Sequence, residues 1–277
     1  MKITSIDLGA TNTRIGYFQY DKEESFYKFA TIRTVDGAKL AGWLTRKVLE
    51  LSPWSSHPDI IVISSFGPID YQSGAIVEPP NYPARHIPLR EEFESNFKNS
   101  IILLVNDAVA GVWSEYLGYA INRNIRDLAY VAVGTGIGVG VIIGGTLLLG
   151  RRGDSHEAGH IVIDYRSSIE CGCGGIGHFE ALYREKGKPG SSTLYNILAA
   201  GIASIVSCYD PELVALGGGA VIRGLDTRRL ASLIADYSFN RRIPIVKLHT
   251  YGEKATIYGG MYIGLRPPKQ LLELNGW

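Results

Sequence analysis

The sequence lacks a charge bias, because its 28 Lys and Arg residues are nearly matched by 27 Asp and Glu residues, which leaves a net charge of +1. Proteins that track nucleic acids or anionic membrane surfaces carry an excess of positive charge, so this balance favours a small-molecule partner. The apolar share of 45% is ordinary for a globular protein. A length of 277 residues is enough for two domains that each bury a core.

Long apolar runs are also lacking. The longest apolar stretches are short and broken by glycine, which argues against a membrane span. Met1 is followed directly by a strand-like run, residues 3–7, so a signal peptide is not expected either. Together these two absences predict a cytoplasmic protein.

Cysteine is scarce, at three residues. Cys171 and Cys173 are too close in sequence for a disulfide to close a stabilising loop, so a metal site is the sharper interpretation of this pair. Cys208 lies in a largely apolar run and is expected to be a buried core residue.

Strand-like runs and helical patterns alternate along the chain, which predicts an α/β architecture. In the first half we expect strands at residues 3–7, 13–18, 27–32, 60–64 and 101–105. The last two are continuous apolar runs, which are typical of central strands. Leu40, Leu44, Val48 and Leu51 form one face of an amphipathic helix between them.

The second half repeats the order of strand, Gly/Thr turn and strand, beginning at residue 128. Helices are expected at residues 192–209 and 226–237, with strands at 213–216 and 245–248. The sequence therefore predicts two lobes with an internally duplicated topology. We place the N-terminal lobe at residues 1–115 and the C-terminal lobe at 116–259, with a tail, 260–277, that can return to the first lobe.

The first candidate phosphate site is a tight turn that follows Asp7 at the end of a strand. Backbone N–H groups and hydroxyls in such a turn can bind phosphate, and the acid can hold Mg²⁺ through water. A plain hairpin turn is the alternative interpretation. The candidate nucleotide-binding residues here are Asp7, Gly9, Thr11, Asn12, Thr13 and Arg14.

Gly134, Thr135 and Gly136 form a second such turn at the equivalent point of the second half, and two turns can clamp a triphosphate. No Gly-Lys-Ser/Thr follows either turn, so neither is a P-loop. The second turn runs into a strand where a dinucleotide fingerprint needs a helix. A third cluster, residues 217–219 (Gly217, Gly218 and Gly219), can admit the flat face of a nucleoside, although a simple strand-to-helix turn explains it equally well.

Five motifs in this order resemble the signature set of the ROK-family sugar kinases, over about residues 3–224. They are Asp7-Leu-Gly-Ala-Thr-Asn-Thr-Arg14, Asn106-Asp107, Gly134-Thr-Gly-Ile-Gly138, Glu157-Ala-Gly-His160 and Cys171-Gly-Cys-Gly-Gly-Ile-Gly-His-Phe-Glu180. The resemblance implies a two-lobed actin-like ATPase (ribonuclease H-like) fold and the use of ATP with Mg²⁺. It also implies a hexokinase or glucokinase that phosphorylates a hexose hydroxyl, with glucose favoured. An N-acetylhexosamine kinase and a sugar-sensing regulator without kinase activity are the alternatives.

Asp107 is the candidate general base. It ends a buried run at the carboxyl edge of a sheet, where α/β proteins bind ligands. A carboxylate there can accept the proton of a sugar hydroxyl as its oxygen attacks the γ-phosphoryl group. Asp107 is also a favoured residue type for an N-cap of the following helix, and both roles can coexist.

Sugar recognition needs several convergent polar groups, because each buried group left unpaired costs roughly 1–3 kcal/mol. The candidate sugar-binding residues are Gly67, Asn81, Asn106, Asp107, Glu157, His160 and Glu180.

A structural zinc is expected on His160, Cys171, Cys173 and His178, a Cys₂His₂ set of the kind that binds tetrahedral Zn²⁺. His178 stands where the family has its third cysteine, so an unmetallated pair, with His160 contacting sugar only, is the alternative. The family's Gly-Ala segment is replaced by residues 151–156, which include Arg151, Arg152 and His156. Crowding there favours plain hexoses over N-acetylated ones.

Two other functional classes fit less well. Operator-binding members of this family carry a helix-turn-helix module ahead of the kinase-like body, and Asp7 lies too near the start of this sequence for one. An actin-like or chaperone-type ATPase has no evident use for the Cys and His motifs. The expected partners are a hexose and ATP, with neither nucleic acid nor membrane; a homodimer is left open.

Overall fold

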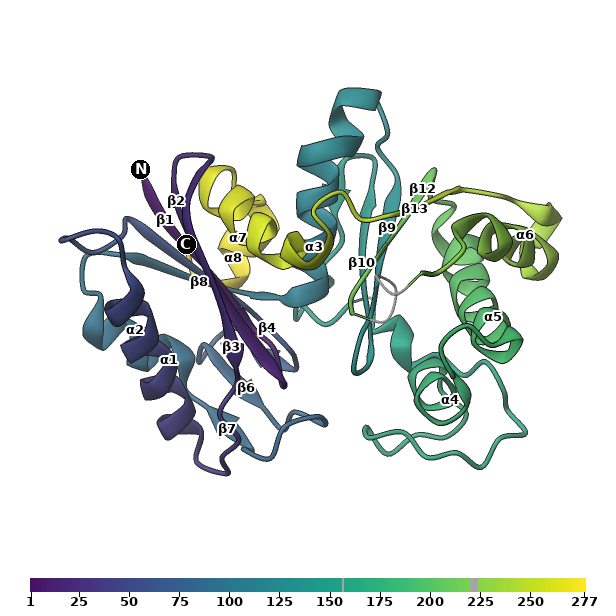
Figure 1. The fold of residues 1–277 in the computed structure, drawn as a ribbon, viewed down its shortest axis with the longest axis horizontal. Coiled ribbons are helices and arrows are strands. Elements are labelled where there is room, and N and C mark those ends of the chain that lie inside the picture. The colour runs from purple at the N-terminus through teal and green to yellow at the C-terminus, as the bar shows by residue number, and fades with distance from the viewer. Residues whose placement is uncertain (156, 220–223) are drawn as a thin grey trace. The chain divides into compact units, whose positions relative to one another are not determined.

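The computed structural model describes residues 1–155, 157–219 and 224–277, and the chain divides into two compact units (Figure 1). Unit 1 consists of Met1–Ala110, Leu149–Ser155 and Thr256–Trp277. Unit 2 consists of Gly111–Leu148 and His156–Ala255.

Unit 1 is built on a five-stranded sheet in the order β3-β2-β1-β4-β8. Its strands are β1 (Lys2–Leu8), β2 (Asn12–Gln19), β3 (Lys22–Ala30), β4 (Ile60–Ser65) and β8 (Ile101–Asn106). β1 is antiparallel to β2 and parallel to β4, and β4 is parallel to β8. A small antiparallel sheet holds β5 (Ile69–Asp70), β6 (Ala75–Val77) and β7 (His86–Ile87).

Helices cover both faces of this sheet, with α1 and α2 on one side and α7 and α8 on the other (Figure 1). They are α1 (Gly37–Leu51), α2 (Leu89–Asn96), α7 (Ala255–Leu265) and α8 (Lys269–Leu274). The expected amphipathic helix is α1. It begins where the Asp36 side chain accepts the Lys39 N–H, and it buries Leu40, Leu44 and Val48.

Helix α7 was not expected from the sequence. It packs closely on β1 because glycines face the strand. A Cβ on Gly260 would come within 2.1 Å of the Ser5 hydroxyl oxygen, and one on Gly264 within 2.9 Å of the Ile3 side chain. The Ser5 hydroxyl in turn donates a 2.7 Å hydrogen bond to the carbonyl of Ile257.

The expectation that residues 101–105 form a central strand is wrong, since β8 is an edge of its sheet. The edge is covered by Asn275, which follows α8 and is 4% exposed. Its amide oxygen accepts the Leu104 N–H at 2.9 Å, and its amide nitrogen donates to the Leu104 carbonyl at 3.0 Å. One side chain thus takes the hydrogen-bonding place of a neighbouring strand at Leu104. The run is as apolar as a central strand because helices cover both faces of the sheet.

Unit 2 repeats the same strand order as β11-β10-β9-β12-β13, so the predicted topological duplication is confirmed. β9 is antiparallel to β10 and parallel to β12, and β12 is parallel to β13. The strands are β9 (Leu128–Val133), β10 (Ile137–Ile143), β11 (Thr146–Leu147), β12 (Leu213–Gly217) and β13 (Ile245–Leu248).

One face of this sheet carries α4 (Phe179–Lys186), α5 (Ser192–Tyr209) and α6 (Thr227–Tyr237) (Figure 1). The end of α3 (Asp107–Glu115) lies on the other. Short helical turns are η1 (Tyr116–Ala120), η2 (Ile121–Arg123), η3 (Ala158–His160), η5 (Phe239–Arg241) and η6 (Gly252–Lys254).

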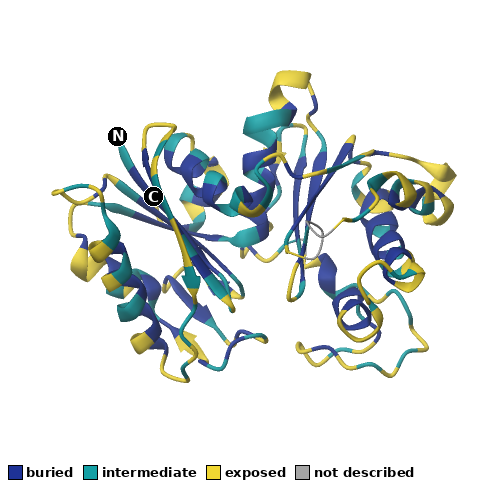
Figure 2. Cartoon of the chain, viewed as in Figure 1, coloured by how far each residue is buried: buried dark blue, intermediate teal, exposed yellow. Residues whose placement is uncertain are grey.

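By length and composition α5 could cross a membrane, which differs from the expectation that the apolar runs are too short for a span. The helix is 56% buried and belongs to the hydrophobic core of unit 2, with Leu198, Ile202 and Ile205 inside (Figure 2). That is the position of a core helix. Cys208, near its end, is exposed, so its assignment to the core is wrong.

The end of α3 is fixed to β13 and the residues after it by a buried polar network. Glu115, which is 0% exposed, accepts hydrogen bonds from the Lys247 ammonium at 2.6 Å and the Thr250 N–H at 2.7 Å. His249 accepts the Tyr251 N–H on Nδ1, so its proton is on Nε2, which donates to the Gly111 carbonyl at 3.0 Å.

This network predicts that the protein loses stability at acidic pH. Burial lowers the pKa of His249 below its ordinary value of 6.5, Lys247 adds to the effect, and Glu115 opposes it. The unfolded chain therefore binds this proton more strongly, so His249 contributes stability above about pH 6.5 that is lost as the pH falls further.

We expect His249→Gln to be less stable than the wild type at pH 8 by about 1–3 kcal/mol, because a buried hydrogen bond is weakened. The variant should lose less stability between pH 8 and pH 5.5, as measured by urea unfolding at each pH. His86→Gln, which changes an exposed histidine, is the control. Equal pH dependence in His249→Gln and the wild type would contradict the prediction.

Candidate active site

The candidate site residues of unit 1 meet at one edge of the parallel strands. Leu8 of β1 pairs with Ser65 of β4, and Ser65 pairs with Asn106 of β8. The carboxyl ends of the three strands are therefore level, and this edge is where open α/β sheets bind ligands. A Cβ built on Gly67, just after β4, would lie 3.6 Å from the side-chain nitrogen of Asn106.

Asn106 and Asp107 share the start of helix α3. The Asn106 side-chain oxygen accepts the N–H groups of Ala108 at 2.9 Å and Val109 at 3.4 Å, as an N-cap residue does. Asp107 is the first residue of the helix and accepts the Ala108 N–H at 2.7 Å with its own carboxylate. The helix start thus holds both side chains at the sheet edge, and the Asp107 side chain is half-buried there.

Asp7, at the end of β1, is paired with Arg14 on the neighbouring strand. The Arg14 guanidinium donates to the Asp7 carboxylate at 2.7 Å, and both side chains are largely buried. Burial raises the pKa of Asp7 above its ordinary value, and Arg14 partly offsets this. Arg14 therefore orients the acid that the sequence assigns to the nucleotide site.

The turn after Asp7 is closed by its own backbone. The Gly9 N–H donates to the Asn12 carbonyl at 3.1 Å, and a Cβ on Gly9 would come within 2.6 Å of that oxygen, so glycine is required. Thr13 is buried, with its hydroxyl 2.8 Å from that of Thr31. Thr11 is the exposed hydroxyl-bearing residue of the turn.

The loop that carries Asn81 is held by its neighbour, Tyr82. The Tyr82 ring stacks on Phe66 at 5.5 Å between centroids, and its hydroxyl donates to the Ile32 carbonyl at 2.6 Å. Phe66 immediately precedes Gly67, so this stack fixes the half-buried Asn81 beside the Gly67 segment. The sequence interpretation missed Tyr82, although a buried aromatic within a proline-rich loop is a usable signal.

In unit 2, helix α4 supports the glycine turn between β9 and β10. The Glu180 carboxylate, 5% exposed, accepts the Ile137 N–H at 2.8 Å. The Tyr183 hydroxyl donates to the Gly134 carbonyl at 3.0 Å. Gly134 and Thr135 remain exposed. Glu180 was expected only as a sugar contact, and its link to this turn was missed.

The third glycine cluster follows β12 and approaches β9 closely. A Cβ on Gly217 would come within 2.3 Å of the Tyr130 hydroxyl oxygen. Gly218 has φ +95° and approaches the Val133 carbonyl, so both positions require glycine. Gly219 has open space around it. The next four residues, 220–223, lie outside the described part of the chain.

The four predicted zinc ligands come together in unit 2. The ligand atoms of His160, Cys171, Cys173 and His178 all lie within 4.8 Å of one another. The sulfur of Cys171 is 3.4 Å from Nδ1 of His160, and that of Cys173 is 3.3 Å from Nδ1 of His178. In a tetrahedral zinc site, bonds of about 2.3 Å to sulfur and 2.0–2.1 Å to nitrogen give sulfur–nitrogen separations of about 3.5 Å. The residues present therefore fit this metal.

The surroundings of the cluster also suit a metal site. Nε2 of His160 points to the Glu157 carboxylate at 3.7 Å, which is the arrangement that orients a metal-binding histidine. A Cβ on Gly175 would come within 2.3 Å of the His178 ring, so glycine is needed there. Burial lowers the pKa of His178, with His160 adding to the effect, which favours the neutral imidazole that binds metals. His156, expected near the site entrance, lies outside the described residues.

Comparison with known proteins identifies the family. The ROK family matches residues 3–188, which is more than half of the chain. The chain belongs to the ROK family. The chain resembles two glucokinases along its whole length. This ROK protein is 33% identical to the glucokinase of Pyrobaculum calidifontis over 98% of its chain and 97% of the relative. It is 29% identical to that of Aeropyrum pernix over 98% of both chains.

Solved structures agree on the fold. The ROK hexokinase of Thermus thermophilus superposes with a TM-score of 0.78 at 25% identity, covering 96% of this chain and 99% of that one. A glucokinase from Streptomyces griseus, solved with glucose and AMPPNP, gives 0.78 at 24% identity over 95% and 99% of the chains. The predicted actin-like ATPase fold is confirmed.

Gly136 lies so close to the Glu180 carboxylate that a larger residue cannot replace it without displacing that group. A Cβ on Gly136 would lie 2.2 Å from the Glu180 carboxylate, so Gly136→Ala must displace it from the Ile137 N–H. We expect a loss of about 1–3 kcal/mol in the free energy of unfolding, measured by urea denaturation. Gly134→Ala is the matched control, because nothing lies within 4 Å of a Cβ there. Equal stability of the two variants would refute the proposed support of the turn.

Proposed function

We propose that this ROK protein transfers the γ-phosphoryl group of ATP to a hydroxyl of a hexose, with glucose preferred and Asp107 as the general base. The observation that carries the proposal is the Asn106-Asp107 pair at the carboxyl end of β8, in a chain that resembles glucokinases along its whole length. A carboxylate at this position has the reach and the chemistry for phosphoryl transfer to an alcohol.

In the proposed reaction, Asp107 accepts the proton of the sugar hydroxyl. The hydroxyl oxygen forms a bond to the γ-phosphorus as the bond between that phosphorus and the leaving ADP oxygen breaks. The Asn106 side chain is already engaged by the helix N–H groups, so it cannot rotate freely and keeps the base in place. Backbone N–H groups at the helix start favour negative charge near them.

Nucleotide contacts are proposed for the glycine turns of each unit. In unit 1 these are the residues after Asp7, with Thr11 exposed, and in unit 2 they are Gly134 and Thr135. Mg²⁺ would be held through water by Asp7, and it would supply charge neutralisation for the phosphates. The exposed Gly219 leaves room for a nucleoside at close backbone approach.

Sugar contacts are proposed for Gly67, Asn81, Asn106, Asp107, Glu157, His160 and Glu180. Plain hexoses are favoured because two glucokinases match the chain over 98% of its length. An N-acetylhexosamine kinase is the alternative, since N-acetylmannosamine kinases are 29–31% identical over 66–68% of the chain.

We expect the wild type to form ADP with glucose, ATP and Mg²⁺ in a coupled assay, and Asp107→Asn to lower kcat by a factor on the order of 10²–10⁴. Glucose binding, followed by calorimetry, should persist in the variant. Asp21→Asn, at an exposed position in the turn after β2, is the control. A kcat of Asp107→Asn within a few-fold of the wild-type value would show that Asp107 is not the general base. Higher activity of the wild type with N-acetylmannosamine than with glucose would overturn the choice of glucose.

We also propose a structural Zn²⁺ on His160, Cys171, Cys173 and His178. Four protein ligands leave no open position for water, so the metal would act on structure rather than in the reaction. Because Glu157 contacts His160, and Glu180 lies two residues after His178, the metal would hold two of the proposed sugar contacts in place.

Protein purified without an affinity tag should contain about one zinc per chain, and Cys171→Ser should lose most of it because a thiolate ligand is gone. Metal content is measured by mass spectrometry, together with the melting temperature. Cys208→Ser is the matched control, since that cysteine is exposed and outside the cluster. Zinc far below one equivalent in the wild type would leave the cluster without a metal role.

For location and partners, we propose a cytoplasmic enzyme that binds neither nucleic acid nor membrane surfaces. The near-zero net charge and the burial of α5 in the core of unit 2 support this. A homodimer stays an open expectation.

A further inference from the structure

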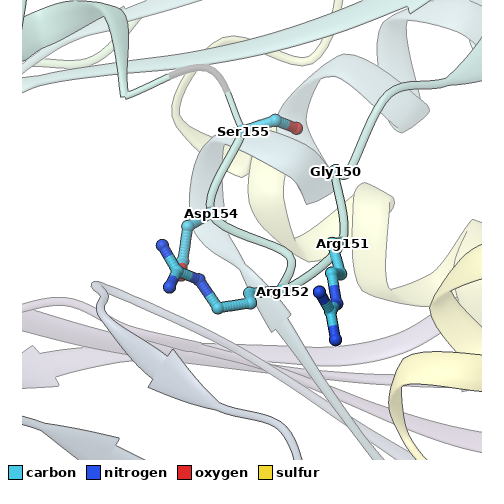
Figure 3. Close-up of a pocket in the computed structure, with 5 residues that line it drawn as sticks. All are labelled: Gly150, Arg151, Arg152, Asp154 and Ser155. Carbon is cyan, nitrogen blue, oxygen red and sulfur yellow. The ribbon is translucent and has the colours of Figure 1, made fainter.

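Unit 1 contains a cavity of about 630 Å³ whose residues are not among the proposed substrate contacts. It is lined by Gly150, Arg151, Arg152, Asp154 and Ser155 (Figure 3). The loop that forms it closes on itself, because the Ser155 N–H donates to the Leu149 carbonyl at 3.1 Å. Gly150 at φ +69° and Gly153 at φ +82° make the bends that this closure needs.

The cavity carries a positive charge that the loop does not neutralise. Nε of Arg152 lies 3.6 Å from the Asp154 carboxylate, and Figure 3 shows the two side chains turned toward each other. Arg151 extends away from that pair, and it has no hydrogen-bond or ion-pair partner among the described residues. Two arginines against one aspartate leave the cavity with one guanidinium available to an anion.

The same loop lies against the part of unit 1 that carries the candidate base. A Cβ on Gly153 would come within 2.3 Å of the Tyr71 ring, which is 5% exposed. Tyr71 directly follows β5, which contacts β8, and β8 ends at Asn106 beside the candidate base.

We propose that Arg151 binds the phosphate group of the hexose phosphate that the reaction forms, so that the cavity is a product site. The inference rests on the proposed kinase function. A guanidinium is always charged and can bind phosphate through two parallel charge-assisted hydrogen bonds, whereas a neutral hexose has no charge to offer it. The cavity therefore distinguishes product from substrate, and retained product inhibits the next turnover. Asp154 weakens this binding, since it neutralises Arg152 and repels the phosphate.

The test is calorimetric titration of the full chain, without ATP, with glucose 6-phosphate, glucose, ADP and inorganic phosphate. We expect Arg151→Gln to raise the Kd for glucose 6-phosphate by about tenfold or more, the loss of one charge-assisted contact, and to leave the Kd for glucose within twofold. Arg228→Gln removes one exposed arginine from α6 in unit 2 and should change neither value.

A second variant should change the Kd for glucose 6-phosphate in the opposite direction. A loop residue with a merely structural role would not give tighter binding when it is replaced. Asp154→Asn should lower the Kd for glucose 6-phosphate, because Arg152 is released and a repelling charge is removed. An unchanged or higher Kd in Asp154→Asn would overturn the inference, as would an unchanged Kd in Arg151→Gln. Melting temperatures confirm that each variant is folded.

The probes separate this inference from the proposed function. If the wild type binds glucose but Arg151→Gln binds glucose 6-phosphate equally well, the product site is wrong while the kinase proposal survives. If Arg151→Gln changes only the Kd for ADP or for inorganic phosphate, the cavity binds another anion and the product assignment is overturned. If the wild type binds neither glucose nor glucose 6-phosphate, both proposals fail together.

Discussion

The parallel, in-register pairing of β1, β4 and β8 is the constraint on which the candidate site of unit 1 depends. Leu8, Ser65 and Asn106 are level across the sheet, so the residues that follow each strand emerge at one edge. A shift of the register by one residue would turn Asn106 to the other face and move the start of α3 with it. The sheet therefore sets the distance between the acid of the first turn and the candidate base.

In unit 2, Glu180 positions candidate site residues, as the strand register does in unit 1. Its carboxylate accepts the Ile137 N–H from the glycine turn, while its backbone lies two residues from His178 of the zinc cluster. The buried carboxylate thus joins the turn proposed to bind phosphate to the loop that carries the proposed metal ligands. Replacing it with an apolar residue would leave the Ile137 N–H buried and unpaired, which is more costly than losing a surface hydrogen bond.

Much of the fold was predictable because periodicity in the sequence follows burial. The runs at residues 192–209 and 245–248 were predicted with the bounds that α5 and β13 have. Helix α7 was missed because apolar and glycine residues occur all round it, so it offers no amphipathic stripe. The edge position of β8 could not be predicted because its partner is a single side chain, that of Asn275, which is 171 residues from Leu104 in the sequence.

The sequence was enough to predict that His160, Cys171, Cys173 and His178 lie together and that Asn106-Asp107 ends a strand, because the proposed chemistry needs those residue types in a fixed order. The contacts that support these residues were not predictable. Tyr82, Tyr183 and the Ile137 N–H act through contacts between residues far apart in sequence, and one sequence gives no signal for such pairs.

At Asp107 the observed structural role is compatible with the proposed catalytic one. A residue that alone capped α3 would have its carboxylate fully committed to backbone N–H groups. Here Asn106 accepts the N–H groups of Ala108 and Val109, and the Asp107 carboxylate shares that of Ala108. This hydrogen bond holds the Asp107 carboxylate at the start of α3. Because a carboxylate has about four lone-pair sites, accepting this N–H is compatible with taking a proton in the proposed reaction.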